Sequence, residues 1–452
     1  TAPDAAAARS RLLFANLDDV WMQRAALSAG SDQAPALFDA VVRGDPGVLA
    51  RASAARAAFV RQLASVIGAR QQAAEVGRII AAVAADRRAD TAWWRAAALD
   101  GLAQGGHGRR SASRMLQGAR ATLLTLHDDA AAEVRAGALA LLQLAGPGAE
   151  AGWGAAVQRA IAVAGPGAAG QGADPQRRAD AITLVAIDHP ERRVEWFSRF
   201  VSPHEPEAVQ VAAVIALGRV RTSEAIGRFL LSHWAEFTPG VRSHAGDVLI
   251  ADPAGARLLV DALSKGTVPP WSLGFWQKQD LVLDKDPAIR DAARAVLEED
   301  PRTRADTVRR YAAALDLAGD PARGEQVFSR ACAACHRLGD TAGGDLGPDL
   351  ATVRHRPPTS LLADILLPSR SIAQHYETYI VERAGGSTAA GVLGAETPTT
   401  ITLRQGGDRE VVIRRADIRK MAVSPQSTMP ADLAQAISPE EMADLLAFVR
   451  RQ

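Results

Sequence analysis

The only two cysteines of this 452-residue chain lie three positions apart, in the pentapeptide Cys332-Ala-Ala-Cys335-His336. This spacing excludes a fold that is built on disulfide bonds between distant segments, in a chain long enough for two or three domains. The apolar fraction of 48% is that of a globular protein, and the net charge of +1 indicates no nucleic-acid partner. The pentapeptide is therefore the most specific feature of the sequence.

Three kinds of site use two cysteines at this spacing. A redox dithiol of the thioredoxin kind belongs to a βαβ unit, and no such pattern surrounds Cys332. A zinc site needs four ligands, and the chain has no second cysteine pair. The adjoining histidine is the signature of c-type haem, because two thiols must reach two vinyl groups while the neighbouring imidazole binds the iron. We therefore expect one covalent haem c on Cys332 and Cys335, with His336 as proximal ligand.

The segment Gly347-Pro348-Asp349-Leu350 follows at a distance that brings a loop against the proximal histidine. A backbone carbonyl of this loop can accept a hydrogen bond from the second ring nitrogen of His336, which fixes its tautomer. Gly347 and Pro348 are therefore predicted to contact the cofactor site. Whether Arg354 and Arg356 meet the haem propionates or face water stays open at this point.

The sixth ligand of the iron must come from the residues that follow. The candidates are Met421, Met429, Met442, His355 and His375. We favour Met429, because Pro425 and Pro430 flank it in an irregular segment that can present it rigidly; His375 is the alternative. Thioether ligation raises the reduction potential relative to two imidazoles. Two protein ligands would leave no open position for a substrate, whereas a vacant position would favour a peroxidase or a gas-binding protein.

Regular elements are predicted on both sides of these motifs. Residues 320–330 form an amphipathic helix with Val327 and Phe328 on its apolar side. Residues 438–450 form a terminal helix that begins with a capping box of Ser438 and Glu441. Between about 376 and 420 the period changes to two, which predicts a small antiparallel β insert with strands at 376–382, 389–393, 399–403 and 410–414.

The first 300 residues repeat one pattern: a usually apolar residue, then Arg or Gln, then Ala three residues after it. The Arg or Gln positions are Gln23, Arg61, Arg95, Arg135, Arg178, Gln210, Arg242 and Arg290. Their steps run from 32 to 48 residues and bracket the period of about 40–47 residues of HEAT-type helical repeats. We therefore predict a mainly α protein: a HEAT-like α-solenoid over residues 1–300, a linker helix over 301–319, and a class I-like monohaem cytochrome c domain over 320–452. The alternative is an irregular, alanine-rich helical domain.

The C-terminal region resembles the haem-binding domain of Planctomycete/Verrucomicrobium type. The resemblance covers about residues 320–449 and is carried by Gly324-x-x-x-Phe328, the CAACH pentapeptide, the Gly347 loop, Ile365-Leu-x-Pro-Ser369, the hairpin at Gly391, Ser427-x-Met-Pro430 and the closing helix. It implies a c-type cytochrome with a small β insert, with haem on Cys332 and Cys335, His336 proximal and Met429 distal. Residues 20–26 and 59–80 are similar to the HEAT-like region that precedes this domain in such proteins.

Many relatives in that family also carry a β-propeller that resembles quinone-dependent sugar dehydrogenases, and no such pattern occurs here. The chain starts at Thr1 rather than Met, so we expect a mature or trimmed form. We expect a periplasmic or otherwise extracytoplasmic electron-transfer protein, not itself an enzyme, that accepts electrons from a partner dehydrogenase docked on the helical region. The alternative is the electron-accepting portion of a quinone-cofactor sugar or alcohol dehydrogenase. No apolar run is long enough to span a membrane.

Overall fold

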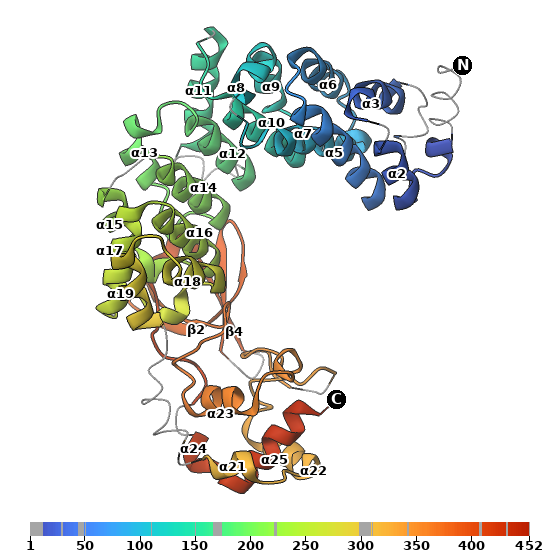
Figure 1. The fold of residues 1–452 in the computed structure, drawn as a ribbon. Helices are drawn as coiled ribbons and strands as arrows, with labels where there is room; N and C mark the ends of the chain where they lie inside the picture. Colours follow the sequence, from blue (N-terminus) through green and yellow to red (C-terminus); the bar gives the residue numbers. More distant parts are fainter. Residues whose placement is uncertain are drawn as a thin grey trace. The chain divides into compact units, whose positions relative to one another are not determined.

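The protein is mainly helical, and its described residues include a small antiparallel sheet, as predicted (Figure 1). The computed structural model describes residues 12–28, 30–43, 49, 51–109, 111–149, 151–165, 174–220, 224–297, 309, 311–340, 343–405, 409–430 and 433–451. The chain divides into two compact units, Thr1–Val194 and Glu195–Gln452. Within the described residues, no helix combines the length and the apolar character that crossing a membrane requires.

The described part of the first unit is made of helices. Its elements are α2 (Val20–Leu27), η1 (Ser31–Gln33), α3 (Ala34–Arg43), α5 (Ala54–Ala69), α6 (Ala73–Ala85), η2 (Ala89–Thr91), α7 (Ala92–Gly106), α8 (Ala112–Leu116), η3 (Gln117–Ala119), α9 (Arg120–Leu126), α10 (Ala132–Ala145), α11 (Ala151–Ala164), α12 (Pro175–Val185) and η5 (Pro190–Arg192). Several helices begin at a side chain that accepts hydrogen bonds from free amides, such as Asp19 before α2 and Asp174 before α12.

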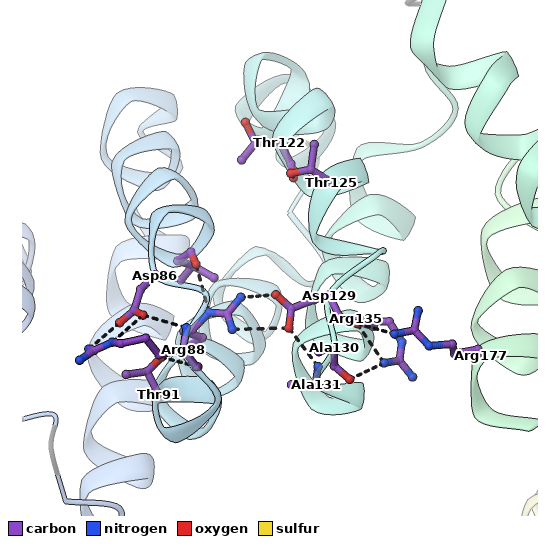
Figure 2. A network of polar contacts seen from close by, with 12 residues as sticks. Asp86, Arg88, Thr91, Thr122, Thr125, Asp129, Ala130, Ala131, Arg135 and Arg177 are labelled. Carbon is purple, nitrogen blue, oxygen red and sulfur yellow. Dashed lines mark hydrogen bonds and ion pairs between the residues drawn. The ribbon is translucent and has the colours of Figure 1, made fainter. Parts of the chain in front are cut away.

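Buried arginines connect successive helices of this unit. Arg95 of α7 forms an ion pair with Asp129, and Arg135 of α10 forms one with Asp180 of α12, with 2.6 Å between Nε and Oδ2. Arg135 also donates to the Asp129 carbonyl at 3.1 Å, and Figure 2 shows these two residues beside Arg177. The recurring arginine of the sequence pattern is therefore a buried residue that satisfies polar groups of neighbouring turns.

Two arginines of the sequence pattern do not follow this rule: Arg61 and Arg290, whose side chain is 30% exposed. The side chain of Arg61 is 41% exposed, and the buried arginine of α5 is Arg56, which pairs with Asp18. In α5 the buried arginine is thus Arg56 and not Arg61, whereas Val60 and Ala64 of the same copy of the pattern are buried.

The second unit combines further helices with the sheet and the C-terminal helices. Its elements are α13 (Val194–Ser198), which begins at the division, α14 (Glu207–Gly218), α15 (Glu224–Ser232), η6 (Trp234–Glu236), α16 (Pro239–Ile250), α17 (Pro253–Ser264), η7 (Pro270–Ser272), α18 (Phe275–Val282), α19 (Pro287–Leu297), α21 (Ala313–Asp316), α22 (Pro321–Ala331), η8 (Leu350–Val353), α23 (Pro358–Leu366), η9 (Arg415–Asp417), α24 (Leu433–Ala436) and α25 (Pro439–Arg450). Residues 301–308 and 310 of the predicted linker helix lie outside the described residues.

The sheet has the strand order β4-β3-β2-β1-β5, and all neighbours are antiparallel. Its strands are β1 (Thr378–Arg383), β2 (Thr388–Glu396), β3 (Thr400–Arg404), β4 (Glu410–Arg414) and β5 (Ile418–Val423). The four predicted strands are confirmed, but β5 was not predicted and extends the insert to Val423. Two adjacent charged residues, Arg419 and Lys420, interrupt its alternation, while Ile418 and Met421 are buried.

The predicted helices around the pentapeptide are confirmed as α22 and α25, which cross closely (Figure 1). Phe328 and Phe448 contact each other at the crossing, with 5.5 Å between ring centroids. Gly324 makes the approach possible, since a Cβ there would lie 2.0 Å from the carbonyl oxygen of Asp444. The Asp444 carboxylate accepts from the amide of Asp320 at 2.6 Å and from Arg323 Nε at 2.7 Å. The start of α22 is thus fixed to the last helix.

Candidate functional site

The pentapeptide forms a turn at the end of α22. The amides of Cys335 and His336 donate to the carbonyl of Cys332 at 3.0 and 2.9 Å, so that Cys332 and His336 lie one turn apart. The loop that follows is hydrogen-bonded back onto this turn. Gly347 donates to the carbonyl of Cys335 at 2.8 Å, and Leu350 donates to that of Arg337 at 2.9 Å.

The predicted contact between this loop and the histidine is present in the structure. His336 Nδ1 lies 2.8 Å from the carbonyl oxygen of Pro348, and this nitrogen must donate because a carbonyl only accepts. The bond leaves Nε2 free as a metal ligand. Gly347 is required here, because a Cβ at this position would lie 2.3 Å from Cε1 of the ring.

Asp349 holds the loop in this conformation. Its Oδ1 accepts from the amides of Gly339 and Ala351 at 2.8 and 2.9 Å. These two backbone hydrogen bonds keep the pKa of the Asp349 carboxyl below its ordinary value, so the group is ionised at neutral pH. These short-range contacts thus fix the loop of residues 343–350, which we call the proximal loop because it lies against His336.

A largely apolar cavity opens beside Cys332 and His336. Its empty space is about 1100 Å³, counted with the part that is open to solvent, which suits a large organic ligand. Gly347 and Pro348 also line it, and Met429 lines it as well. Its apolar wall includes Leu346, Leu350, Leu361, Ile365, Ile437, Leu445, Leu446 and Val449. Cys335 is half-buried and is not among the lining residues.

The five candidates for a sixth ligand occupy different environments. Met421 is fully buried in the core of the sheet, and Met442 is fully buried between α22 and α25. His355 and His375 are exposed and do not line the cavity. Met429 is half-buried and lines the cavity together with His336. Of these five residues, Met429 is the one that the fold brings to the cavity.

The two arginines left open by the sequence differ in position. Arg356 lines the cavity and pairs with Asp364, another lining residue, at 2.6 Å. Arg354 is not a lining residue, and its Nε donates to the carbonyl of Ala351 at 3.0 Å. Of the two, only Arg356 is placed to meet a polar group of a ligand in the cavity.

Sequence reasoning did not identify Tyr376 as part of the site. Tyr376 lines the cavity, and the Arg404 guanidinium of β3 lies 5.8 Å from its ring centroid. Arg404 Nη1 also donates to the carbonyl of Asp345 at 2.7 Å. The Arg404 side chain therefore contacts both the proximal loop and the lining residue Tyr376. No motif spacing signals this contact, because it depends on the folding of the sheet.

The thiols themselves do not favour the two other uses of a Cys-x-x-Cys spacing. Burial, with a smaller contribution from Cys335, raises the pKa of the Cys332 thiol to about 11, and burial also raises the pKa of Cys335. A redox-active dithiol needs a lowered pKa instead. In the part of the chain that the structure describes, no three or more His, Cys, Asp or Glu side chains are grouped to hold a metal ion.

The residues present fit a covalent haem. Such a group needs an apolar cavity, thiols at its edge and an imidazole with one free nitrogen. The cavity is lined by the Cys332 thiol and by His336, whose Nδ1 is engaged by Pro348. A second potential axial ligand, Met429, belongs to the same lining.

Comparison with known proteins agrees with this geometry. No curated protein sequence matches the chain. A family match covers residues 321–396, which include the pentapeptide and the loop at Gly347 but end at the last residue of β2, before Met429. Residues 321–396 match the cytochrome c family, and this part of the chain therefore supports a c-type cytochrome that binds haem c covalently and transfers electrons.

Proposed function

We propose that this protein is an extracytoplasmic electron carrier with one haem c, attached to Cys332 and Cys335 and ligated by His336 and Met429. The observation that carries the proposal is the single cavity lined by the Cys332 thiol, the His336 imidazole and the Met429 thioether. Met421, Met442, His355 and His375 lie elsewhere, which supports Met429 over each of them.

The haem supplies a one-electron couple between ferrous and ferric iron. The chain provides the surroundings that this couple needs. The Pro348 carbonyl holds the proton on His336 Nδ1 and fixes the ring orientation. Leu361, Leu445 and Leu446 are buried against the cavity and exclude water, which keeps the local dielectric constant low. Met429 comes from a loop in which Ser427 caps its amide at 3.1 Å.

We further propose that the helical region, predicted as residues 1–300, is a docking scaffold for the redox partner. Solenoids present extended surfaces to other proteins, and buried arginines at recurring positions, among them Arg95, Arg135 and Arg242, support a repeated helical unit. A periplasmic dehydrogenase is the partner that suits an electron-accepting haem outside the cytoplasm. In this proposal the domain comprising residues 320–452 carries the cofactor, and the linker over 301–319 joins it to the scaffold.

The first test is spectroscopic. Protein produced in a periplasm that matures cytochromes c is expected to weigh one haem more than its polypeptide and to give a low-spin ferrous spectrum on reduction. In the Met429→Ala variant the sixth ligand is lost, so the reduced protein should bind carbon monoxide, which wild type should not.

Met421→Ala is the matched control, because it removes a buried methionine that does not line the cavity. It should lower stability but leave carbon monoxide binding as in wild type. A colourless protein would contradict the haem, and a Met429→Ala variant that still excludes carbon monoxide would contradict the ligand.

A second experiment addresses the role of the chain. The purified protein, supplied with sugars or alcohols, a quinone cofactor and Ca²⁺, should show no turnover of its own. It should be reduced rapidly once a quinone-dependent dehydrogenase is added. Substrate oxidation by the chain alone would overturn its assignment as a carrier.

A further inference from the structure

The recurring arginine has a different partner in one helix of the second unit. In the first unit, Arg95 and Arg135 pair with aspartates of neighbouring helical segments. Arg242 occupies the same position of the sequence pattern in α16 and is 1% exposed. Its carboxylate partner is Glu377, which lies directly before β1 rather than in another helix.

Arg242 is the centre of a buried network between α16 and the sheet. Its Nη1 lies 3.1 Å from Glu377 Oε1, and its Nη2 donates to the Tyr379 hydroxyl at 2.7 Å and to the Phe237 carbonyl at 2.8 Å. The Tyr379 hydroxyl donates to the same Phe237 carbonyl at 2.8 Å. Glu377 is 3% exposed and Tyr379 is fully buried.

Such a network is not explained by stability alone. Glu377 Oε2 is buried and makes no hydrogen bond with the described part of the protein. A buried ion pair that is incompletely satisfied contributes little more than apolar residues of the same volume. What the network does provide is a fixed position for the start of β1 relative to α16.

The start of β1 lies between a residue that lines the cavity and the end of β5. Tyr376, the residue before Glu377, lines the cavity. Thr378, the residue after it, accepts from the amide of Ser424 at 2.7 Å, at the point where β5 ends and the segment to Met429 begins. A second hydrogen bond holds the segment from Ser424 to Met429, because the Ser427 amide donates to Ser369 Oγ at 3.1 Å.

We propose that Arg242 and Glu377 are positioning residues for the distal ligand: they hold the β1–β5 pair, and through it Tyr376 and the Met429 segment, in place against the haem cavity. The inference rests on the proposed function, because it takes Met429 as the sixth ligand. Arg242, an arginine of the recurring sequence pattern, would thereby couple helix α16 to the coordination of the iron.

The test uses Glu377→Gln in the full haem-loaded protein. Imidazole is added to the ferric protein, where it competes with the methionine for the iron, and its affinity is read from the absorption spectrum. If Glu377 positions the distal segment, the variant should bind imidazole about tenfold more tightly than wild type, the change expected from losing one charged hydrogen bond. Asp180→Asn is the matched control, because it changes the carboxylate of the equivalent buried pair in the first unit. It should leave imidazole affinity unchanged.

Tyr379→Phe is the second variant, since it removes the hydroxyl but keeps the ion pair and the packing. Like Glu377→Gln, it should raise the affinity for imidazole above that of wild type. If Glu377→Gln fails to fold, the affinity of Tyr379→Phe tests the proposal in its place. The proposal is overturned if both folded variants bind imidazole as wild type does, or if Asp180→Asn has the same effect. If wild type already binds imidazole as tightly as Met429→Ala, methionine ligation itself is wrong, which separates failure of the proposed function from failure of this inference.

Discussion

The two sides of the cavity are built in different ways. The side of His336, from Cys332 to Leu350, is held mostly by hydrogen bonds within one short stretch of chain, with one long-range contact from Arg404 to Asp345. The side for which we propose Met429 as distal ligand depends on a residue 93 positions after His336 and on a five-stranded sheet between them. The proximal side is thus mainly a local structure and the distal side a tertiary one, and they should respond differently to substitution.

The largest effect on the cofactor itself is expected on the proximal side, from Gly347→Val. A Cβ there would lie 2.3 Å from the His336 ring, so the ring must rotate away or the loop must move. Changes next to a metal-binding histidine typically cost about 10–100-fold in affinity, and we expect a loss of that order in haem-loaded protein, measured as haem absorbance per mole of chain.

Gly385→Val is the control for that substitution, since a Cβ at position 385 meets nothing within 4 Å. It should load haem normally. Normal loading of Gly347→Val would show that the proximal side is not held as tightly as its local contacts indicate.

Phe448→Ala tests the structure that both sides share. Phe448 is fully buried at the crossing of α22 and α25, and removing such a ring costs about 3–5 kcal/mol. Denaturant unfolding followed at the haem should show this loss, with proximal and distal ligation disappearing in one transition. Val412→Ala on β4, where Val412 is 62% exposed, should cost under about 1 kcal/mol. Separate transitions for the two ligands would mean that the crossing supports only one side.

Met429→His acts on the distal side alone. Replacing a thioether by an imidazole lowers the reduction potential, and we expect a decrease of at least about 60 mV, a tenfold change for one electron. Redox titration measures it, and Met421→Leu in the sheet core should leave the potential near its wild-type value. An unchanged potential in Met429→His would place the ligand elsewhere.

The smallest effect is expected from Asp444→Asn, in the dependence of stability on pH. Hydrogen bonds from Arg323 keep the pKa of the Asp444 carboxyl below its ordinary value in the folded protein. The unfolded chain therefore binds a proton more readily, so the contribution is complete above the ordinary carboxyl pKa and is lost as the pH falls through the lowered one. Unfolding midpoints at neutral pH and near pH 3 should differ less in the variant than in wild type. An equal difference in both would assign the acid sensitivity to other carboxylates.

The sequence predicted most of what is local. The helices α22 and α25, the strands β1 to β4 and the contact of the Pro348 loop with His336 all follow from patterns within a few residues. β5 was missed because Arg419 and Lys420 disturb its alternation. In α5 the pattern includes Arg61, which is 41% exposed, although Val60 and Ala64 of the same copy are buried; the spacing alone does not show that Arg56 is the buried arginine of this helix.

Tertiary structure decided the rest. The sequence offered five residues for one axial position, and only folding shows that Met421 and Met442 are enclosed in hydrophobic cores while Met429 reaches the cavity. The contacts of Arg404 with Tyr376 and of Arg242 with Glu377 join segments that no motif relates. The sequence by itself determined the prediction of covalent haem attachment, because the two thiols and the imidazole that it needs lie within one turn of the chain and depend on no remote segment. It did not determine the distal side, because strand pairing and buried ion pairs acquire their geometry only when remote parts of the chain pack together.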